Sequence, residues 1–123
     1  MAGAPSIATL RQLTKRAQFL NAALGRRAGR RAFSLQAIAV DNAQPGVGFT
    51  VTKKAGNSPE RNRIRRRLRA AARACAQSLR PQHDYVLVGR REALSIAFDE
   101  VVADLASALK KLHASEEAGP KRP

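Results

Sequence analysis

Residues 51–69 read VTKKAGNSPERNRIRRRLR, and this stretch holds the signals that decide the fold. It begins at the end of segment 47–52, in which apolar and small polar residues alternate as in a half-buried strand. A polar loop containing Gly56 follows. Ser58 and Pro59 then indicate a helix start, with Ser58 as the N-cap and Pro59 in the first turn. The stretch therefore predicts a strand, a glycine loop and a long basic helix.

The expected helix continues to about residue 79 and ends before Pro81, because the residue ahead of a proline is disfavoured in helical conformation. Wound at about 100° per residue, it gathers its apolar side chains in one sector, which predicts a core face of Ile64, Leu68, Ala71, Cys75 and Leu79. The opposite sector holds Asn62, Arg66, Arg69, Arg73 and Arg80, with Arg63 and Arg67 along one edge and Arg65 along the other. Arg61 falls near the apolar sector, so we expect it to reach back over the preceding loop.

This basic face differs from a helix surface that meets only water. Solvated faces generally mix acidic and basic side chains, because like charges four positions apart destabilise a helix by about 0.2–0.5 kcal/mol. Here Arg65 and Arg69, and then Arg69 and Arg73, form such pairs. A polyanion lying against the helix would offset the repulsion, and arginine can bind phosphate through two hydrogen bonds. A nearly pure arginine face indicates recognition of shape and charge rather than of base edges, which suits folded RNA.

The net charge of the 123-residue chain is +14, and it is unevenly distributed. Residues 1–83 contain 17 basic and two acidic side chains, whereas residues 84–123 contain six basic and seven acidic ones. Such a field favours a polyanionic partner, either nucleic acid or an anionic membrane. Neither a membrane-spanning run nor the apolar segment of a signal peptide is evident, which favours nucleic acid and a cytoplasmic protein. The single Cys75 is expected to be a buried, inert thiol.

The rest of the chain adds short elements around this helix. The first is a helix that Thr14 caps and that stops at Gly25, with Phe19, Ala22, Ala23 and Leu24 on its apolar side. A basic turn over 26–31, one or two strands within 31–40 and a turn over 41–46 follow it. After the basic helix we expect a buried strand over 84–89 and a helix over 98–112. We expect one domain over 13–112, with a flexible leader over 1–12 and a disordered tail over 113–123.

Residues 51–69 closely resemble the signature of the bacterial ribonuclease P protein component. In that family a Lys-Lys-x-Gly-x strand end leads into an Arg-Asn-Arg helix, and here 53–57 and 61–63 match in residue type and spacing. A looser resemblance extends over 13–112. It implies an α+β fold, an α/β sandwich with helices packed on a small mixed sheet in the order α-β-β-β-α-β-α. It also implies a left-handed βαβ crossover like that of the second domain of ribosomal protein S5, although right-handed connections are the rule.

The resemblance also implies a function. The family's protein joins a catalytic RNA, and the complex removes the 5′ leader from precursor tRNA with Mg²⁺ held mainly by the RNA. The implied partners are this RNA and precursor tRNA, with no membrane and no small-molecule substrate. The residues that match the RNA-binding region are Lys53, Lys54, Gly56, Asn57, Arg61, Asn62, Arg63, Arg65, Arg66, Arg69 and Arg73. A cleft for the leader, between the first helix and the sheet, would contain Lys15, Phe19, Phe33 and Gln36.

The expected cleft departs from the family pattern, which is rich in aromatic side chains. Ala23 stands one helical turn after Phe19, and Gln36 occupies a strand position where an aromatic residue is expected. Fewer rings predict weaker or more polar contacts to the leader. Phe19 and Phe33 could stack on bases or pack in the core, and the sequence leaves both interpretations open.

The sequence indicates no catalytic site made by the protein's own side chains. A metal-dependent nuclease needs several converging carboxylates, and Glu60 stands alone beside the basic motif, where it suits helix capping. His83 and His113 are thirty positions apart and are not expected to act as an acid–base pair. Two alternatives to the family function remain: a ribosomal or other structural RNA-binding protein, and a nuclease that acts alone.

Overall fold

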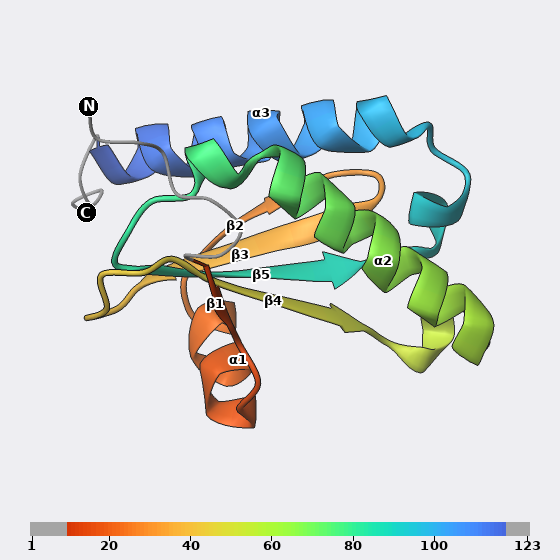
Figure 1. Cartoon of the computed structure of the whole chain (residues 1–123), viewed down its shortest axis with the longest axis horizontal. Helices are drawn as coiled ribbons and strands as arrows, with labels where there is room; N and C mark the ends of the chain where they lie inside the picture. The colour runs from red at the N-terminus through yellow and green to blue at the C-terminus, as the bar shows by residue number, and fades with distance from the viewer. Residues whose placement is uncertain (1–9, 118–123) are drawn as a thin grey trace, which may run out of the picture.

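The computed structural model describes residues 10–117, which form one five-stranded mixed sheet with helices on both faces (Figure 1). The strands are β1 (Arg11–Gln12), β2 (Arg26–Gly29), β3 (Phe33–Ala39), β4 (Gly46–Val51) and β5 (His83–Gly89). The α-helices are α1 (Arg16–Ala23), α2 (Ser58–Ala74) and α3 (Phe98–Glu117). The short 3-10 helices are η2 (Lys53–Ala55), η3 (Ala76–Ser78) and η4 (Arg91–Leu94).

The strands lie in the order β1-β4-β5-β3-β2. β3 pairs antiparallel with β2 and with β5, whereas β4 pairs parallel with β1 and with β5. α2 forms the crossover between the parallel neighbours β4 and β5. The α+β class and the expected order α-β-β-β-α-β-α are therefore confirmed, with β1 as an additional edge strand. The hand of the crossover stays a prediction from the family resemblance.

β2 lies where a basic turn was predicted, and that prediction is wrong for residues 26–29. In β2 the buried Ala28 alternates with more exposed neighbours, and Arg26 pairs with Ala37 of β3. β3 is a single strand, so the third strand of the expected order comes from β2 and not from a division of 31–40. A strand of four residues is too short to show a clear hydrophobic period.

β1 falls within the predicted flexible leader, which is a second correction. The Arg11 N–H donates to the carbonyl of Pro45 at 2.7 Å, and the Leu13 N–H donates to the carbonyl of Val47 at 3.0 Å. These bonds tie residues 11–13 to the free edge of β4. Two paired residues carry no sequence period, so the strand could not be recognised from composition. Residues 1–9 of the leader and 118–123 of the tail lie outside the described residues.

The two faces of the sheet carry different cores. α2 and α3 cover one face, where Phe33, Leu35 and Leu87 are buried with the apolar stripes of both helices. α1 covers the other face over a smaller cluster formed with Leu13, Ile38 and Val86. The predicted core residues of the basic helix segment are all buried, with at most 6% of their surface exposed: Ile64, Leu68, Ala71, Cys75 and Leu79.

The limits of α1 differ from the prediction. Thr14 does not cap the helix; instead Gln18 Oε1 accepts hydrogen bonds from the N–H groups of Thr14 and Lys15, both at 3.0 Å. Lys15 is the N-cap, so α1 begins one residue later than expected, at Arg16. Leu24, predicted on its apolar side, is 82% exposed because it lies past the last helical turn.

α2 and α3 also end at unexpected positions. α2 stops at Ala74, because the chain must turn through η3 before it enters β5, so Arg80 lies beyond the helix. α3 continues to Glu117, so the beginning of the predicted disordered tail is helical. His113 is 8% exposed within this helix, and its ring contacts the buried Tyr85. This partner explains how a polar residue extends the apolar stripe of α3.

Candidate nucleic-acid interface

A capping box fixes the start of α2. Asn57 is the N-cap, in place of the predicted Ser58: its side-chain oxygen accepts from the Glu60 N–H at 2.9 Å, and Glu60 Oε1 accepts from the Asn57 N–H at 2.9 Å. Gly56 precedes the cap with a φ of 153°, and a Cβ there would lie 2.5 Å from Glu60 Oε1. The motif glycine is therefore required both by its conformation and by the approach of Glu60.

Arg91 of η4 holds this cap from outside the motif. Its guanidinium donates to both carboxylate oxygens of Glu60, at 3.1 and 3.0 Å, and to the carbonyl of Ala55 at 3.1 Å. The hydrogen bond from Arg91, followed by that from the Asn57 N–H, lowers the pKa of Glu60 below its ordinary value. Sequence reasoning missed Arg91, because the contact spans 31 positions and no local pattern announces it.

Arg61 reaches back over the loop, as predicted. It donates from Nη1 to the carbonyl of Gly56 at 2.7 Å and from Nη2 to Ser58 Oγ at 3.1 Å. Arg61 therefore fixes the conformation of the loop that carries Lys53 and Lys54, both of which are exposed.

The basic side of α2, here called the arginine face, lacks acidic partners. Of the described residues, no carboxylate lies within 4.0 Å of any cationic group on this face. Within the face, Arg65 Nη1 donates to Asn62 Oδ1 at 3.0 Å. The side chains are exposed or half-buried, so their charge is directed to the surface. The members of the arginine face are Asn62, Arg63, Arg65, Arg66, Arg69 and Arg73.

Arg69 has an aromatic neighbour that the sequence did not assign to this surface. Its guanidinium carbon lies 5.4 Å from the centre of the half-buried Phe49 ring of β4, within cation–π distance. Arg67, expected along one edge of the face, instead turns toward the α3 side and donates to the carbonyl of Ile96. Most arginines of α2 therefore lie at the surface, whereas Arg67 links α2 to the η4–α3 connection.

Three of the four residues expected in the leader cleft lie on the α1 side of the sheet. Phe19 is in α1, Gln36 is in β3, and the exposed Lys15 immediately precedes α1. The strand register places Gln36, Val86 and Gly48 in one row. The Phe19 ring lies against Gly48, where an added Cβ would come within 2.8 Å of the ring. Phe19 is half-buried, so part of it remains at the surface.

Phe33 does not belong to this cleft. Its side chain is 0% exposed and lies in the core beneath α2 and α3. Residues an odd number of positions apart in a strand point to opposite faces, so Phe33 and Gln36 cannot line the same side. Of the two interpretations left open for Phe33, core packing is correct.

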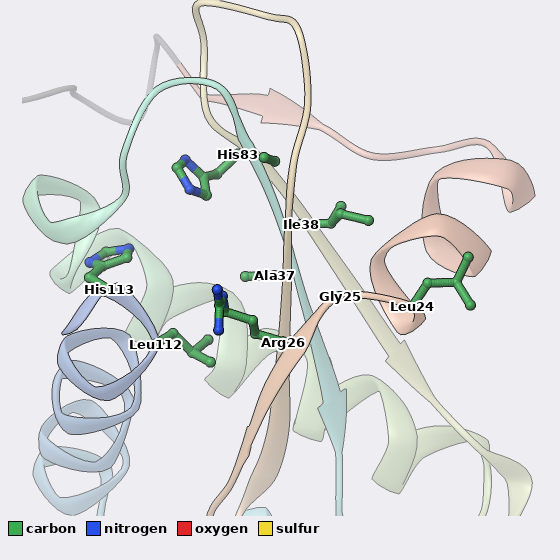
Figure 2. Close-up of a pocket in the computed structure, with 9 residues that line it drawn as sticks. Leu24, Gly25, Arg26, Ala37, Ile38, His83, Leu112 and His113 are labelled. Carbon is green, nitrogen blue, oxygen red and sulfur yellow. The ribbon is translucent and has the colours of Figure 1, made fainter. Parts of the chain in front are cut away.

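His83 and His113, which are thirty positions apart in the sequence, line the same pocket. Figure 2 shows His83 of β5, His113 of α3 and Arg26 of β2 around a pocket of about 320 Å³. The two imidazole centres are 6.2 Å apart, and His113 Nε2 lies 2.8 Å from the Tyr85 hydroxyl. His83 Nδ1 lies 2.8 Å from the carbonyl of Pro81. These contacts account for the ring positions as parts of the packing between α3 and the sheet.

Within residues 10–117 no three His, Cys, Asp or Glu side chains converge as a metal site would require. Cys75 is buried, and burial raises the pKa of its thiol, as expected for an inert structural cysteine. Across the same residues, no helix combines the length and apolar character needed to cross a membrane.

The family model described as Ribonuclease P matches residues 7–113. The chain belongs to the ribonuclease P protein family. The ribonuclease P protein component of Ruegeria pomeroyi is 47% identical over 107 residues, covering 83% of this chain and 86% of the relative. That of Gluconacetobacter diazotrophicus is 43% identical over 104 residues, covering 81% and 89%.

Solved ribonuclease P proteins share the fold. The protein from Thermotoga maritima superposes with a TM-score of 0.72 at 23% identity, covering 82% of this chain and 96% of that one. The protein from Staphylococcus aureus gives a TM-score of 0.70 at 22% identity, covering 81% and 93%. The predicted family and fold class are therefore confirmed.

Proposed function

We propose that this chain is the protein subunit of a ribonuclease P ribonucleoprotein that removes the 5′ leader from precursor tRNA in the cytoplasm. It binds the catalytic RNA through the arginine face and the loop that carries Lys53 and Lys54. The RNA carries the catalysis, and the protein lowers phosphate repulsion where RNA and substrate meet.

The arginine face is the observation that carries this proposal. Its cations repel one another along a single helix, and the described residues supply no carboxylate within 4.0 Å to compensate them. Elsewhere on the surface some arginines do have carboxylate partners: Arg31 pairs with Glu100 at 3.2 Å and with Asp104 at 3.4 Å, and Arg91 pairs with Glu60 at 3.0 Å. A face without nearby carboxylates supports an anionic partner, and membership of the ribonuclease P family favours RNA as that partner.

The leader is proposed to lie along the α1 face of the sheet. Lys15 would offer a charge to its phosphates, Gln36 a polar contact, and Phe19 the exposed part of a ring. Because Phe33 is buried, this chain offers one phenylalanine of the expected pair to a base. We therefore expect weak, largely polar contacts to the leader.

Mg²⁺ belongs to the RNA partner in this proposal. The groups on the arginine face are guanidinium and amide groups, whereas magnesium prefers carboxylates and phosphate oxygens. The donor set of this surface does not fit the ion. Neutralised phosphates would instead let the RNA bind its ions at lower magnesium concentration.

Reconstitution tests the proposal. The protein is combined with the ribonuclease P RNA of the same genome and with precursor tRNA, and leader removal is followed as magnesium is lowered. We expect the protein to lower the magnesium concentration that is needed, and the double variant Arg66→Ala, Arg69→Ala to lose most of this effect. Arg31→Ala is the matched control, because this arginine already has acidic partners.

Two results would contradict the proposal. If the protein binds RNA but gives no gain in leader removal, a structural RNA-binding role is favoured. If the protein alone cleaves precursor tRNA in magnesium, the catalysis resides in its own side chains.

A further inference from the structure

A second feature beside the arginine face has no role in the proposed function so far. α2 and the η4–α3 connection line an open hollow of about 340 Å³ at the surface. Its lining combines cationic and apolar side chains: Arg63, Arg66, Arg67, Ala70, Leu94 and Phe98.

Phe98 gives this hollow an aromatic wall. It is the first residue of α3 and is 41% exposed, although a phenylalanine is ordinarily buried. The other large apolar side chains exposed in the described part of the chain are Leu20 and Leu24, near α1. Phe98 is thus an aromatic side chain held at the surface directly beside the arginine face.

The arginines of the hollow occupy different depths. Arg63 and Arg66 are exposed at the rim, and no described carboxylate lies within 4.0 Å of either. Arg67 lies deeper, held by its bond to the Ile96 carbonyl, and its Nε is buried without a hydrogen-bond partner. Glu100, which follows Phe98 closely, is engaged with Arg31 and does not line the hollow.

We propose that an unpaired nucleotide of the ribonuclease P RNA binds in this hollow, with its base stacked on Phe98 and its flanking phosphates on Arg63 and Arg66. The inference rests on the proposed function and extends it from phosphate binding to capture of a base. A nucleotide within an RNA strand has one flat base and a phosphate on either side. The hollow offers one aromatic ring, Phe98, next to two neighbouring cations, Arg63 and Arg66. A helical RNA segment could satisfy the cations but would leave Phe98 in water.

A single tryptophan reports on this site directly. The chain contains no tryptophan, so Phe98→Trp introduces the only indole fluorophore. We expect saturating ribonuclease P RNA to quench the emission of Trp at position 98, because a stacked base quenches indole. Leu24→Trp is the control: it places the indole at an exposed site near α1, and RNA without precursor tRNA should leave its emission unchanged.

Affinity measurements separate stacking from charge. Phe98→Ala should raise the dissociation constant for the RNA about 5- to 150-fold, the range expected when one base stack is lost, and Phe98→Leu should cause much of the same loss. Neither change should alter the salt dependence, whereas Arg66→Ala should reduce it. Circular dichroism of both Phe98 variants checks that α3 still folds.

The outcomes distinguish this inference from the proposed function. If the wild-type protein fails to bind the RNA, the proposed function itself is wrong. Suppose instead that the wild-type protein binds the RNA with the expected salt dependence. If RNA then leaves the emission of Phe98→Trp unchanged, as for Leu24→Trp, and Phe98→Ala binds as tightly as wild type, only the nucleotide pocket is overturned. Emission that changes with protein concentration in the absence of RNA would identify a second copy of the chain as the occupant and would also overturn it.

Discussion

Glu60 and Arg91 are separated by 31 positions and meet through two hydrogen bonds, at 3.1 and 3.0 Å. The same Glu60 carboxylate accepts from the Asn57 N–H, and the same Arg91 guanidinium donates to the Ala55 carbonyl. One ion pair thereby joins the glycine loop, the first turn of α2 and η4. The position of the arginine face depends on a residue that follows β5.

Replacing Arg91 should make the stability of the protein less sensitive to acid. Arg91 is the largest cause of the lowered pKa of Glu60, whose ordinary value is 4.5. A lowered carboxyl pKa stabilises the fold above the ordinary pKa, and this contribution is lost as the pH falls through the lowered value. The melting temperatures of wild type and Arg91→Ala should therefore differ most near neutral pH and converge below about pH 4.5. Arg90→Ala, which removes a neighbouring exposed arginine, should give a pH-independent difference; a constant gap for Arg91→Ala would contradict the prediction.

Gly56→Ala should destabilise the protein by about 1–3 kcal/mol, because its backbone conformation is almost restricted to glycine. The added Cβ would also meet Glu60 Oε1 at 2.5 Å and Arg91 Nη1 at 2.9 Å. Urea unfolding measures the loss. Gly29→Ala is the matched control, since its Cβ would find its nearest neighbour at 3.5 Å, an ordinary contact. Equal stability of the two variants would show that the loop adapts without cost.

Salt dependence should separate the arginines that bind RNA from those that support the fold. The slope of log affinity against log salt should fall by about 0.7–0.9 for each phosphate contact removed. We expect this decrease for Arg66→Ala and for Arg69→Ala. Arg31→Ala should leave the slope unchanged, because Arg31 is paired with Glu100 and Asp104. An unchanged slope for the Arg66 and Arg69 variants would place the RNA on another surface.

The sequence was informative where a signal was local or periodic. The apolar stripe from Ile64 to Ala71 and the backward reach of Arg61 follow from helix geometry alone, and both are present in the structure. Leu79 is buried as predicted, but it lies beyond the end of α2. The fold class and family followed from the motif at 51–69. In each case the residues that decide the outcome lie within a few helical turns of one another.

Most of the failures arose from contacts between distant segments. β1 and β2 are too short to show a period, and each becomes a strand only because a neighbouring strand offers it a free edge. The partner of Glu60 and the joining of His83 with His113 depend on how β5 and α3 close over the sheet. Phe33 was assigned to the wrong face, although the alternation along β3 already contained the information that separates it from Gln36.

Phe19 provides the sharpest test of the proposed leader cleft. In Phe19→Leu the side chain keeps an apolar contact with Gly48 but loses the ring that could stack on a base. If the leader binds here, the affinity of the holoenzyme for precursor tRNA should fall by up to about 1–3 kcal/mol, while its affinity for mature tRNA should stay the same. Phe33→Leu is the control, because this buried side chain should lower stability without changing the ratio of the two affinities. If Phe19→Leu also leaves the ratio unchanged, Phe19 is a packing residue between α1 and the sheet, and the leader must be held by the polar side chains or elsewhere.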